Sequence, residues 1–223
     1  MKARFAPYPF PGWGRFLLLL VIQFSLTGVV EAQRKCGWDQ AVSDAIARHP
    51  ELRARWEELQ AGPRLSLGLL NANRLNAGPV TIPVVVHIVL TNPSQVTDSA
   101  VLSQIAVLNR DYNASNPDTS QVPGSFKPLV GNMQMNFCLA RRDPQGNPTT
   151  GIVRVVTSQT EFSINNACQG VKHASSGGSD AWNDSSYLNI WVCNMQAGFL
   201  GVTTPSGMYP DDEQGVVIQY TAF

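Results

Sequence analysis

The segment from Thr81 to Leu90, which reads TIPVVVHIVL, constrains the fold more than any other part of this sequence. It is almost unbroken in apolar, mostly β-branched residues and lacks the polar/apolar alternation of a half-exposed strand. Such a run is typical of a strand covered on both faces, and strands of that kind belong mainly to parallel sheets. We therefore predict a buried central strand over residues 81–90.

A helix is expected directly after this strand. Four apolar side chains recur at steps of four, three and four, as on one face of a helix: Val101, Ile105, Leu108 and Tyr112. Thr97 or Asp98 can cap the first turn. Further strand-like stretches lie at residues 133–140, 152–157, 187–193 and 216–220. Strand, helix and strand in this order need crossovers, so we predict an α/β fold with a twisted, mixed, mostly parallel sheet and a backing helix.

The N-terminus has the pattern of a signal peptide. Lys2, Arg4 and Arg15 precede an apolar stretch over residues 16–30, and short residues at the cleavage positions end at Ala32. A membrane anchor is the alternative, but an anchor needs about 20 predominantly apolar residues, and polar residues interrupt this shorter stretch. We predict a leader over residues 1–32 and a secreted protein without a membrane anchor.

A separate segment is expected between the leader and the sheet domain. Residues 39–61 have the pattern of two short helices broken at Pro50, with an apolar stripe. Residues 62–79 carry Gly, Pro and Asn without a sustained period, which is typical of a connector. The predicted organisation is therefore a helical segment with its linker over residues 33–79 and a main domain over residues 80–223.

The balance of charge excludes two classes of partner. The chain contains 16 Lys and Arg and 16 Asp and Glu, so its formal net charge is zero. No run of basic residues interrupts the chain, and nothing predicts a nucleic-acid groove or binding to an anionic membrane surface.

A search for catalytic motifs finds none. The only histidines, His49, His87 and His173, lack the His-Glu-x-x-His spacing that places two zinc ligands on one helix face. No segment matches the Gly-x-Ser-x-Gly elbow of serine hydrolases. We predict a hydrogen-bonded core imidazole at His87, a solvated one at His173, a flexible loop at 175–179 and a solvated turn, rather than a calcium loop, at 209–215. No catalytic residue and no metal ligand are expected in this chain.

Several short phrases occur in a fixed order along residues 81–223. They are Ile82-Pro-Val-Val-Val-His87, Leu108-Asn-x-Asp-Tyr112, Phe137-Cys-Leu-Ala140, Asp180-Ala-Trp-Asn183, Tyr187-Leu-Asn-Ile-Trp-Val-Cys193 and Gly215-Val-Val-Ile-x-Tyr-Thr-x-Phe223. The ordered set resembles the opening of the catalytic domain in the pappalysin or cytophagalysin metallopeptidases, the ulilysin-like family of the metzincins. The resemblance implies that the main domain is the N-terminal subdomain of a metzincin catalytic domain.

The family's zinc site is expected beyond these phrases. In the family the last phrase leads into a helix reading His-Glu-x-x-His-x-x-Gly-x-x-His, whereas this sequence stops at Phe223. The resemblance therefore implies zinc for a full-length member, no zinc bound by this chain, and no peptidase activity of the chain by itself.

The resemblance also implies a site for an extended peptide. Metzincins present an antiparallel edge strand just before their final strand, which here places that strand at residues 199–203. Four of its residues are the candidate substrate-binding residues: Leu200, Gly201, Val202 and Thr203. An extended peptide can pair with the free backbone groups of such a strand. An ordinary edge strand without a ligand is the alternative.

Four cysteines follow the leader: Cys36, Cys138, Cys168 and Cys193. An oxidising compartment permits disulfides, and four cysteines allow three full pairings, among which the sequence does not choose. By resemblance, Cys36 in Arg34-Lys-Cys-Gly37 is a latency cysteine whose thiolate occupies the zinc until a propeptide is removed. A plain disulfide, such as Cys36 with Cys168, is the alternative, and both remain open.

Three hypotheses for function follow. The first is an incomplete chain of a secreted zinc-dependent metalloendopeptidase, with a helical propeptide and with peptide or protein substrates. The second is a secreted, non-catalytic peptide-binding or inhibitory module that retains the metzincin sheet. The third, an unrelated extracellular adhesion or lectin-like domain, requires the ordered phrases to be coincidental.

Overall fold

The computed structural model describes residues 35–60, 78–205 and 207–223. The predicted leader and most of the predicted linker lie outside the described residues. The chain divides into two compact units, Met1–Gln33 and Arg34–Phe223, and the description below concerns the second. Within its described part, no helix has the length and apolar character needed to cross a membrane.

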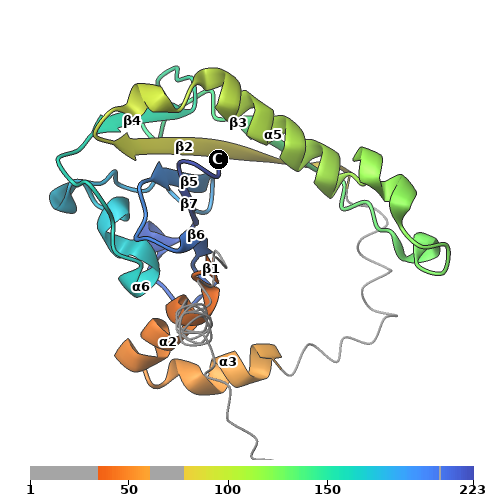
Figure 1. The fold of residues 1–223 in the computed structure, drawn as a ribbon, viewed down its shortest axis with the longest axis horizontal. Coiled ribbons are helices and arrows are strands. Elements are labelled where there is room, and N and C mark those ends of the chain that lie inside the picture. Colours follow the sequence, from red (N-terminus) through yellow and green to blue (C-terminus); the bar gives the residue numbers. More distant parts are fainter. Residues whose placement is uncertain (1–34, 61–77, 206) are drawn as a thin grey trace, which may run out of the picture. The chain divides into compact units, whose positions relative to one another are not determined.

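The predicted central strand is β2, Val80–Leu90, and it organises the sheet (Figure 1). On one side its first half pairs with β3 (Met135–Leu139) and its second half with β4 (Ile152–Val156). On the other side it pairs with β5 (Leu188–Cys193). All three pairings are parallel, as the β-branched run predicts.

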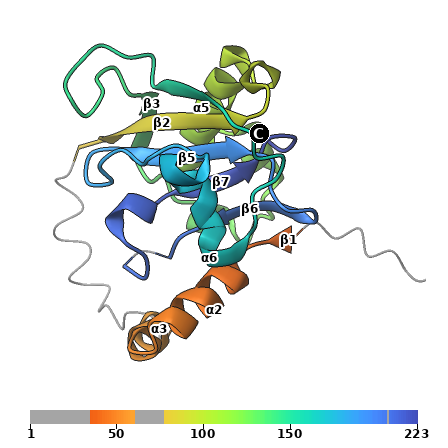
Figure 2. The ribbon, with the colours of Figure 1, turned by 90° about the vertical axis from the view of Figure 1, so that its left-hand side faces the viewer.

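Beyond β5, the sheet ends in an edge whose strands run opposite to the others. β7 (Val216–Gln219) pairs in parallel with β5, β6 (Phe199–Thr203) pairs antiparallel with β7, and β1 (Lys35–Cys36) pairs in parallel with β6. The order is β1-β6-β7-β5-β2-β3, with β4 beside β2, in a seven-stranded sheet (Figure 2). The predicted mixed, mostly parallel sheet is confirmed.

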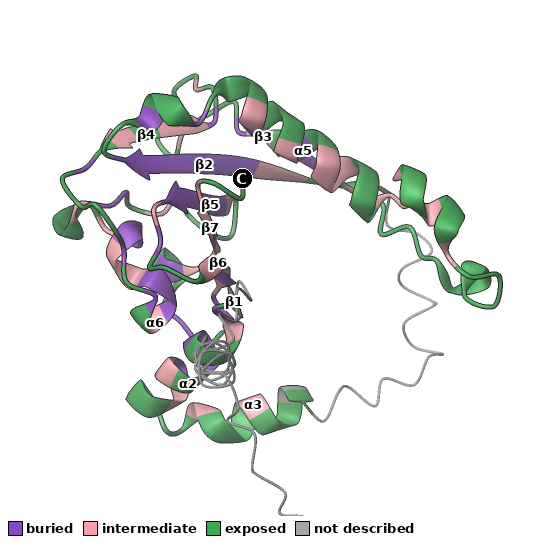
Figure 3. Ribbon diagram, viewed as in Figure 1, coloured by how far each residue is buried: buried purple, intermediate pink, exposed green. Residues whose placement is uncertain are grey.

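The alternation of side chains along β2 divides the interior into two cores. Val84, Val86 and Ile88 point to one face and pack in a cluster with helix α5 (Asp98–Tyr112). Val89 points to the other face, into a cluster that Trp191 and Cys193 of β5 share. Both faces of the sheet centre are therefore covered, and Figure 3 shows β2 and β5 as buried over most of their length.

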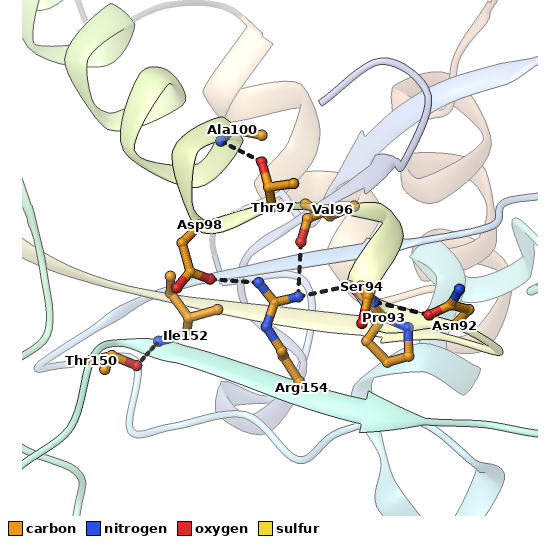
Figure 4. A network of polar contacts seen from close by, with 10 residues as sticks. All are labelled: Asn92, Pro93, Ser94, Val96, Thr97, Asp98, Ala100, Thr150, Ile152 and Arg154. Carbon is orange, nitrogen blue, oxygen red and sulfur yellow. Dashed lines mark hydrogen bonds and ion pairs between the residues drawn. The ribbon is translucent and has the colours of Figure 1, made fainter.

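Helix α5 begins where the sequence predicts. Thr97 is its N-cap, and Thr97 Oγ1 accepts a hydrogen bond from Ala100 N at 3.2 Å. Arg154 of β4 ties this end to the sheet, because its guanidinium donates to the carbonyls of Pro93 and Val96 and pairs with Asp98 at 2.5 Å (Figure 4). The start of the helix is thus fixed against the strand that pairs with the second half of β2.

The second face is covered by α2 (Trp38–Arg48) and by the short helix α6 (Asn165–Cys168). Helix α3 (Leu52–Gln60) follows α2 after a break at Pro50, as predicted. The remaining elements are short 3₁₀ helices: η1 Pro93–Gln95, η2 Pro117–Gln121, η3 Lys127–Leu129, η4 Gln169–Lys172, η5 Ala174–Ser176 and η6 Asp211–Glu213. Since η5 occupies part of the predicted flexible loop and Ser179 is buried, that loop is structured instead.

Candidate functional site

Strand β6 is the antiparallel edge strand expected at residues 199–203. Its register with β7 sets Gly201 opposite Ile218, Val202 opposite Val217 and Thr203 opposite Val216. The Val202 side chain is buried in the core beneath the sheet, whereas its neighbours in β6 are half-buried. The four candidate substrate-binding residues are therefore all on β6: Leu200, Gly201, Val202 and Thr203. One side of this strand pairs with β7, and its open side, away from β7, can pair with a further strand.

The two residues of β1 occupy that open side of β6. Lys35 pairs with Phe199 and Cys36 with Gly201, in parallel, and the backbone N–H of Gly37 donates to Gly201 O at 2.8 Å. An extended piece of the same chain thus adds a strand to the edge, which is the backbone chemistry by which peptides bind sheet edges.

Gly37 is the point at which this added strand leaves the sheet edge. A Cβ at this position would lie 2.7 Å from Ile164 Cδ1 and 2.9 Å from Val202 Cβ, closer than real Cβ atoms approach their neighbours. The backbone can reach Gly201 O only because residue 37 has no side chain. The lack of space beside Ile164 and Val202 therefore explains why a glycine follows Cys36.

Helix α2 holds the added strand in place by packing. Ala41, Val42 and Ala45 are buried in the same core as Val202. Tyr209 Oη donates to Ala41 O at 2.7 Å, and the Arg48 guanidinium lies 4.8 Å from the centre of the Tyr209 ring. The segment that contains β1 and α2 is thus docked on the domain through apolar contacts and hydrogen bonds.

Cys36 lies in β1, at the edge of the sheet, where it is exposed and in register with Gly201. All four cysteines are free in the described structure, which therefore gives no support to the alternative Cys36–Cys168 disulfide. The Cys168 thiol is instead fully buried and within hydrogen-bonding distance of the Cys193 thiol. The structure brings Cys36 to the predicted substrate-binding strand, a juxtaposition that the sequence does not predict.

Solved structures of related proteins match this arrangement. A mutant of promirolysin from Tannerella forsythia is 37% identical, with a TM-score of 0.70, over 85% of this chain and 61% of that chain. Mature T. forsythia mirolysin in complex with a cleaved peptide is 42% identical, with a TM-score of 0.62, over 66% of this chain and 55% of that chain. Mirolysin in complex with compound 9 gives the same values.

The chain belongs to the pappalysin-type, ulilysin-like metallopeptidases. This confirms the resemblance read from the ordered phrases. The chain spans 55–61% of the length of these structures. No family model and no curated protein matches it.

The zinc of the pappalysin-type enzymes does not fit the residues described. Among residues 35–60, 78–205 and 207–223, no group of three His, Cys, Asp or Glu side chains is placed to hold a metal ion. An open groove of about 730 Å³ lies where β6 ends and β2, β5 and β7 begin, and Thr203, Thr204 and Gln214 form part of its lining. The described part of the domain therefore offers a sheet edge, with which β1 pairs, and a groove.

The predicted core histidine of this pappalysin-type domain lies in the central strand β2. His87 is fully buried, stacks on Trp191 at 5.3 Å between ring centres, and lies 2.9 Å from Ser179 Oγ and 3.2 Å from Asn189 Oδ1. Because Asn189 Oδ1 can only accept, His87 Nε2 carries the proton and Nδ1 accepts from Ser179. Burial lowers the pKa of His87 to about 4, although the Asn189 bond and the Asp180 charge oppose this.

A buried charge network links η4 and η6, and the sequence does not predict it. Lys172 is fully buried, and its Nζ donates to the backbone carbonyl of Glu213 at 2.8 Å. Burial lowers the pKa of Lys172 to about 8, although the Glu213 charge opposes it. Glu213 is itself buried and accepts from Gln169 Nε2 at 2.6 Å, while His173 Nε2 lies 3.6 Å from its carboxylate.

Two expectations about this region need correction. The turn at 209–215 is solvated only in part, because Pro210, Asp211 and Asp212 are exposed but Tyr209 and Glu213 are buried. His173 is only partly exposed and faces a buried carboxylate. Isolated charged residues in a polar sequence carry no local signal of burial, since their partners lie about 40 residues away along the chain.

Proposed function

We propose that residues 80–223 form the N-terminal subdomain of the catalytic domain of a secreted zinc-dependent metalloendopeptidase that hydrolyses peptide bonds in proteins. In this proposal residues 1–32 are the leader, residues 33–79 are the propeptide, and the zinc-binding helix lies outside residues 1–223. The observation that carries it is the pairing of β1 with β6, where a segment of the chain itself occupies the edge strand that a substrate needs.

The coverage of the related structures supports a propeptide. The promirolysin match covers 85% of this chain, which is about 190 residues, and the mature mirolysin match covers 66%, which is about 147 residues. The difference between the two matches is about 43 residues. The additional match to the pro-form thus has the size of the segment that carries β1, α2 and α3.

The proposed substrate site is the open side of β6, at Leu200, Gly201, Val202 and Thr203. A peptide that pairs there needs the Gly201 carbonyl, which Gly37 N engages in this structure. Occupation by β1 and binding of a substrate therefore exclude each other, and this competition is a physical basis for latency. Peptide complexes of mirolysin support a peptide partner for the family.

Cys36 is the proposed latency cysteine. Its exposed position at the rim, directly before the glycine that contacts Gly201 O, supports this role. Zinc is the proposed cofactor of the complete protein, and its ligands are assigned outside the described residues. In that protein, Cys36→Ala is expected to hasten activation, whereas unchanged latency would leave Cys36 without this role.

Reading the coding DNA downstream of the Phe223 codon tests the proposal. An in-frame His-Glu-x-x-His shortly after residue 223 supports the metalloendopeptidase. A stop codon with no such motif nearby contradicts it and favours the secreted peptide-binding or inhibitory module, which the lack of a metal-holding group among the described residues also fits.

A biochemical prediction accompanies this test. Purified residues 33–223 are expected to release no fragments from a denatured protein substrate and to bind no stoichiometric zinc, because the described residues contain no ligand set. The measurements are a chelator-controlled peptidase assay and metal analysis. Chelator-sensitive cleavage, or one tightly bound zinc per chain in a Cys36→Ala background, would contradict the assignment of the ligands.

A further inference from the structure

Two of the four cysteines lie together inside the domain. Cys168 ends α6 and Cys193 ends β5, and both side chains have no exposed surface. They belong to the same apolar core, and their thiols lie within hydrogen-bonding distance of each other. Cys36 and Cys138 are exposed by contrast. The fold thus selects one pair of thiols from the six pairs that four cysteines allow.

The backbone that carries Cys168 is unusual. Asn166, Ala167 and Cys168 have φ angles of 51°, 54° and 62°, so three consecutive residues with side chains adopt the left-handed conformation. In this conformation the Cβ atom crowds the following carbonyl oxygen, and such residues normally occur singly. A run of three persists only where the surrounding structure holds it.

Helix α2 supplies part of the support for the left-handed turn. Asp44 Oδ2 accepts a hydrogen bond from the backbone N–H of Asn166 at 2.7 Å, and Ala41 and Ala45 pack in the same core as Ala167. If residues 33–79 are removed as a propeptide, these contacts are lost while the left-handed turn stays in the mature domain. A covalent bond within residues 80–223 would then replace part of the lost support.

We propose that Cys168 and Cys193 are a disulfide-forming pair that fixes the left-handed turn to strand β5. The inference rests on the proposed function only for the removal of residues 33–79, and its test does not depend on peptidase activity or on export. A donor disulfide, such as glutathione disulfide or that of a thiol oxidoreductase, supplies the oxidant. One cysteine thiolate attacks it to give a mixed disulfide, and the second thiolate then displaces the donor sulfur. Two S–H groups become one S–S bond, the donor disulfide is reduced to two thiols, and these take up the two protons that the cysteines lose.

The burial of both thiols sets when this reaction takes place. Solvent oxidants do not reach either sulfur in the folded domain, so the bond forms during folding, before the core closes. Once formed, it is shielded from exchange with external thiols for the same reason. The competing interpretation is that both cysteines act only as small apolar side chains.

Mass mapping tests the pairing directly. Residues 33–223 are refolded in a buffer of reduced and oxidised glutathione, denatured, blocked with N-ethylmaleimide and digested without reduction. The expected result is a peptide pair joined through Cys168 and Cys193, with Cys36 and Cys138 carrying the maleimide. Maleimide on both Cys168 and Cys193, or a link from either one to Cys36 or Cys138, would overturn the proposal.

Thermal unfolding provides a second readout that does not depend on a variant folding. The wild-type chain refolded with glutathione disulfide is expected to melt about 10 °C higher than the same chain refolded with reductant, because the bond closes a loop of roughly 25 residues. Cys193→Ala should abolish this difference, whereas Cys138→Ala, at an exposed thiol, should keep it. Equal melting temperatures for the oxidised and reduced wild-type chain would contradict a stabilising bond.

Discussion

At the scale of single residues, His87 shows how completely β2 is buried. Its imidazole is neutral in the folded domain down to a pKa of about 4, whereas in the unfolded chain it titrates near 6.5. Between these values the unfolded state binds more protons, so the stability of the fold falls as the pH decreases from 6.5 to 4. Above pH 6.5 both states are neutral and this contribution is constant.

The His87 contribution is measurable with a substitution. Over the window from pH 6.5 to 4, the wild type is expected to lose about 3 kcal/mol of unfolding free energy more than His87→Gln does. Denaturant unfolding at several pH values measures the difference. His49→Gln, which removes an exposed imidazole, is the matched control. Parallel pH profiles for wild type and His87→Gln would show that His87 is not held neutral by burial.

At the scale of elements, the docking of α2 rests on its buried small residues. Ala45 has no exposed surface, so Ala45→Glu introduces an unpaired charge into the core, and we expect a loss of several kcal/mol of docking free energy. Ser43→Glu, on the exposed side of the same helix, is expected to have little effect. In chains carrying a protease site within residues 61–77, the cleaved α2 segment should co-elute with the domain in wild type and Ser43→Glu. It should separate in Ala45→Glu, and co-elution there would contradict docking by this face.

The elements differ in how far the sequence could predict them. The strand at 80–90 and the helix at 98–112 carry their own signal, because burial on two faces or on one leaves a distinct apolar pattern. Strand β1 has only two residues and pairs with a partner more than 160 positions away, so no local pattern could reveal it. The left-handed turn at 166–168 also has no local sequence signal, since it contains no glycine.

The same distinction applies to the site. The resemblance places residues 199–203 at the edge, because the phrases fix the order of strands. The burial of Lys172 and Glu213 depends on contacts between distant segments, and charged residues are otherwise mostly exposed.

At the scale of the whole molecule, residues 80–223 are expected to fold poorly by themselves. Without residues 33–79 the domain loses Ala41, Val42 and Ala45 from one core. On the other core, Leu188, Ile218, Tyr220 and Phe223 are only partly buried. Leaving a few hundred Å² of apolar surface in water forfeits on the order of 5–10 kcal/mol, comparable to the net stability of a typical domain.

Melting and dye binding test this expectation. Residues 80–223 should bind a hydrophobic dye and lack a sharp cooperative transition, and extension through the zinc-binding half proposed to follow should restore one. A monomeric fragment that melts cooperatively and binds no dye would contradict the expectation and favour a self-sufficient binding module.

Strand β6 is proposed to be a peptide-binding edge that the chain's own N-terminal segment occupies. Backbone amide exchange in residues 33–223, resolved by NMR, tests this occupation. Because Gly201 O bonds to Gly37 N, the N–H of Gly201 also faces β1, whereas the N–H of Val202 faces β7. Gly37→Val, which cannot fit against Ile164 and Val202, should expose Gly201 alone.

The amide of Gly201 is expected to be protected in the wild type, to exchange at least tenfold faster in Gly37→Val, and to regain protection when a synthetic peptide of residues 33–40 is added. Val202 should stay protected throughout, which shows that the sheet is intact. Gly201 exchange that neither Gly37→Val nor the added peptide changes would contradict the assignment of β6 as an occupied peptide-binding edge.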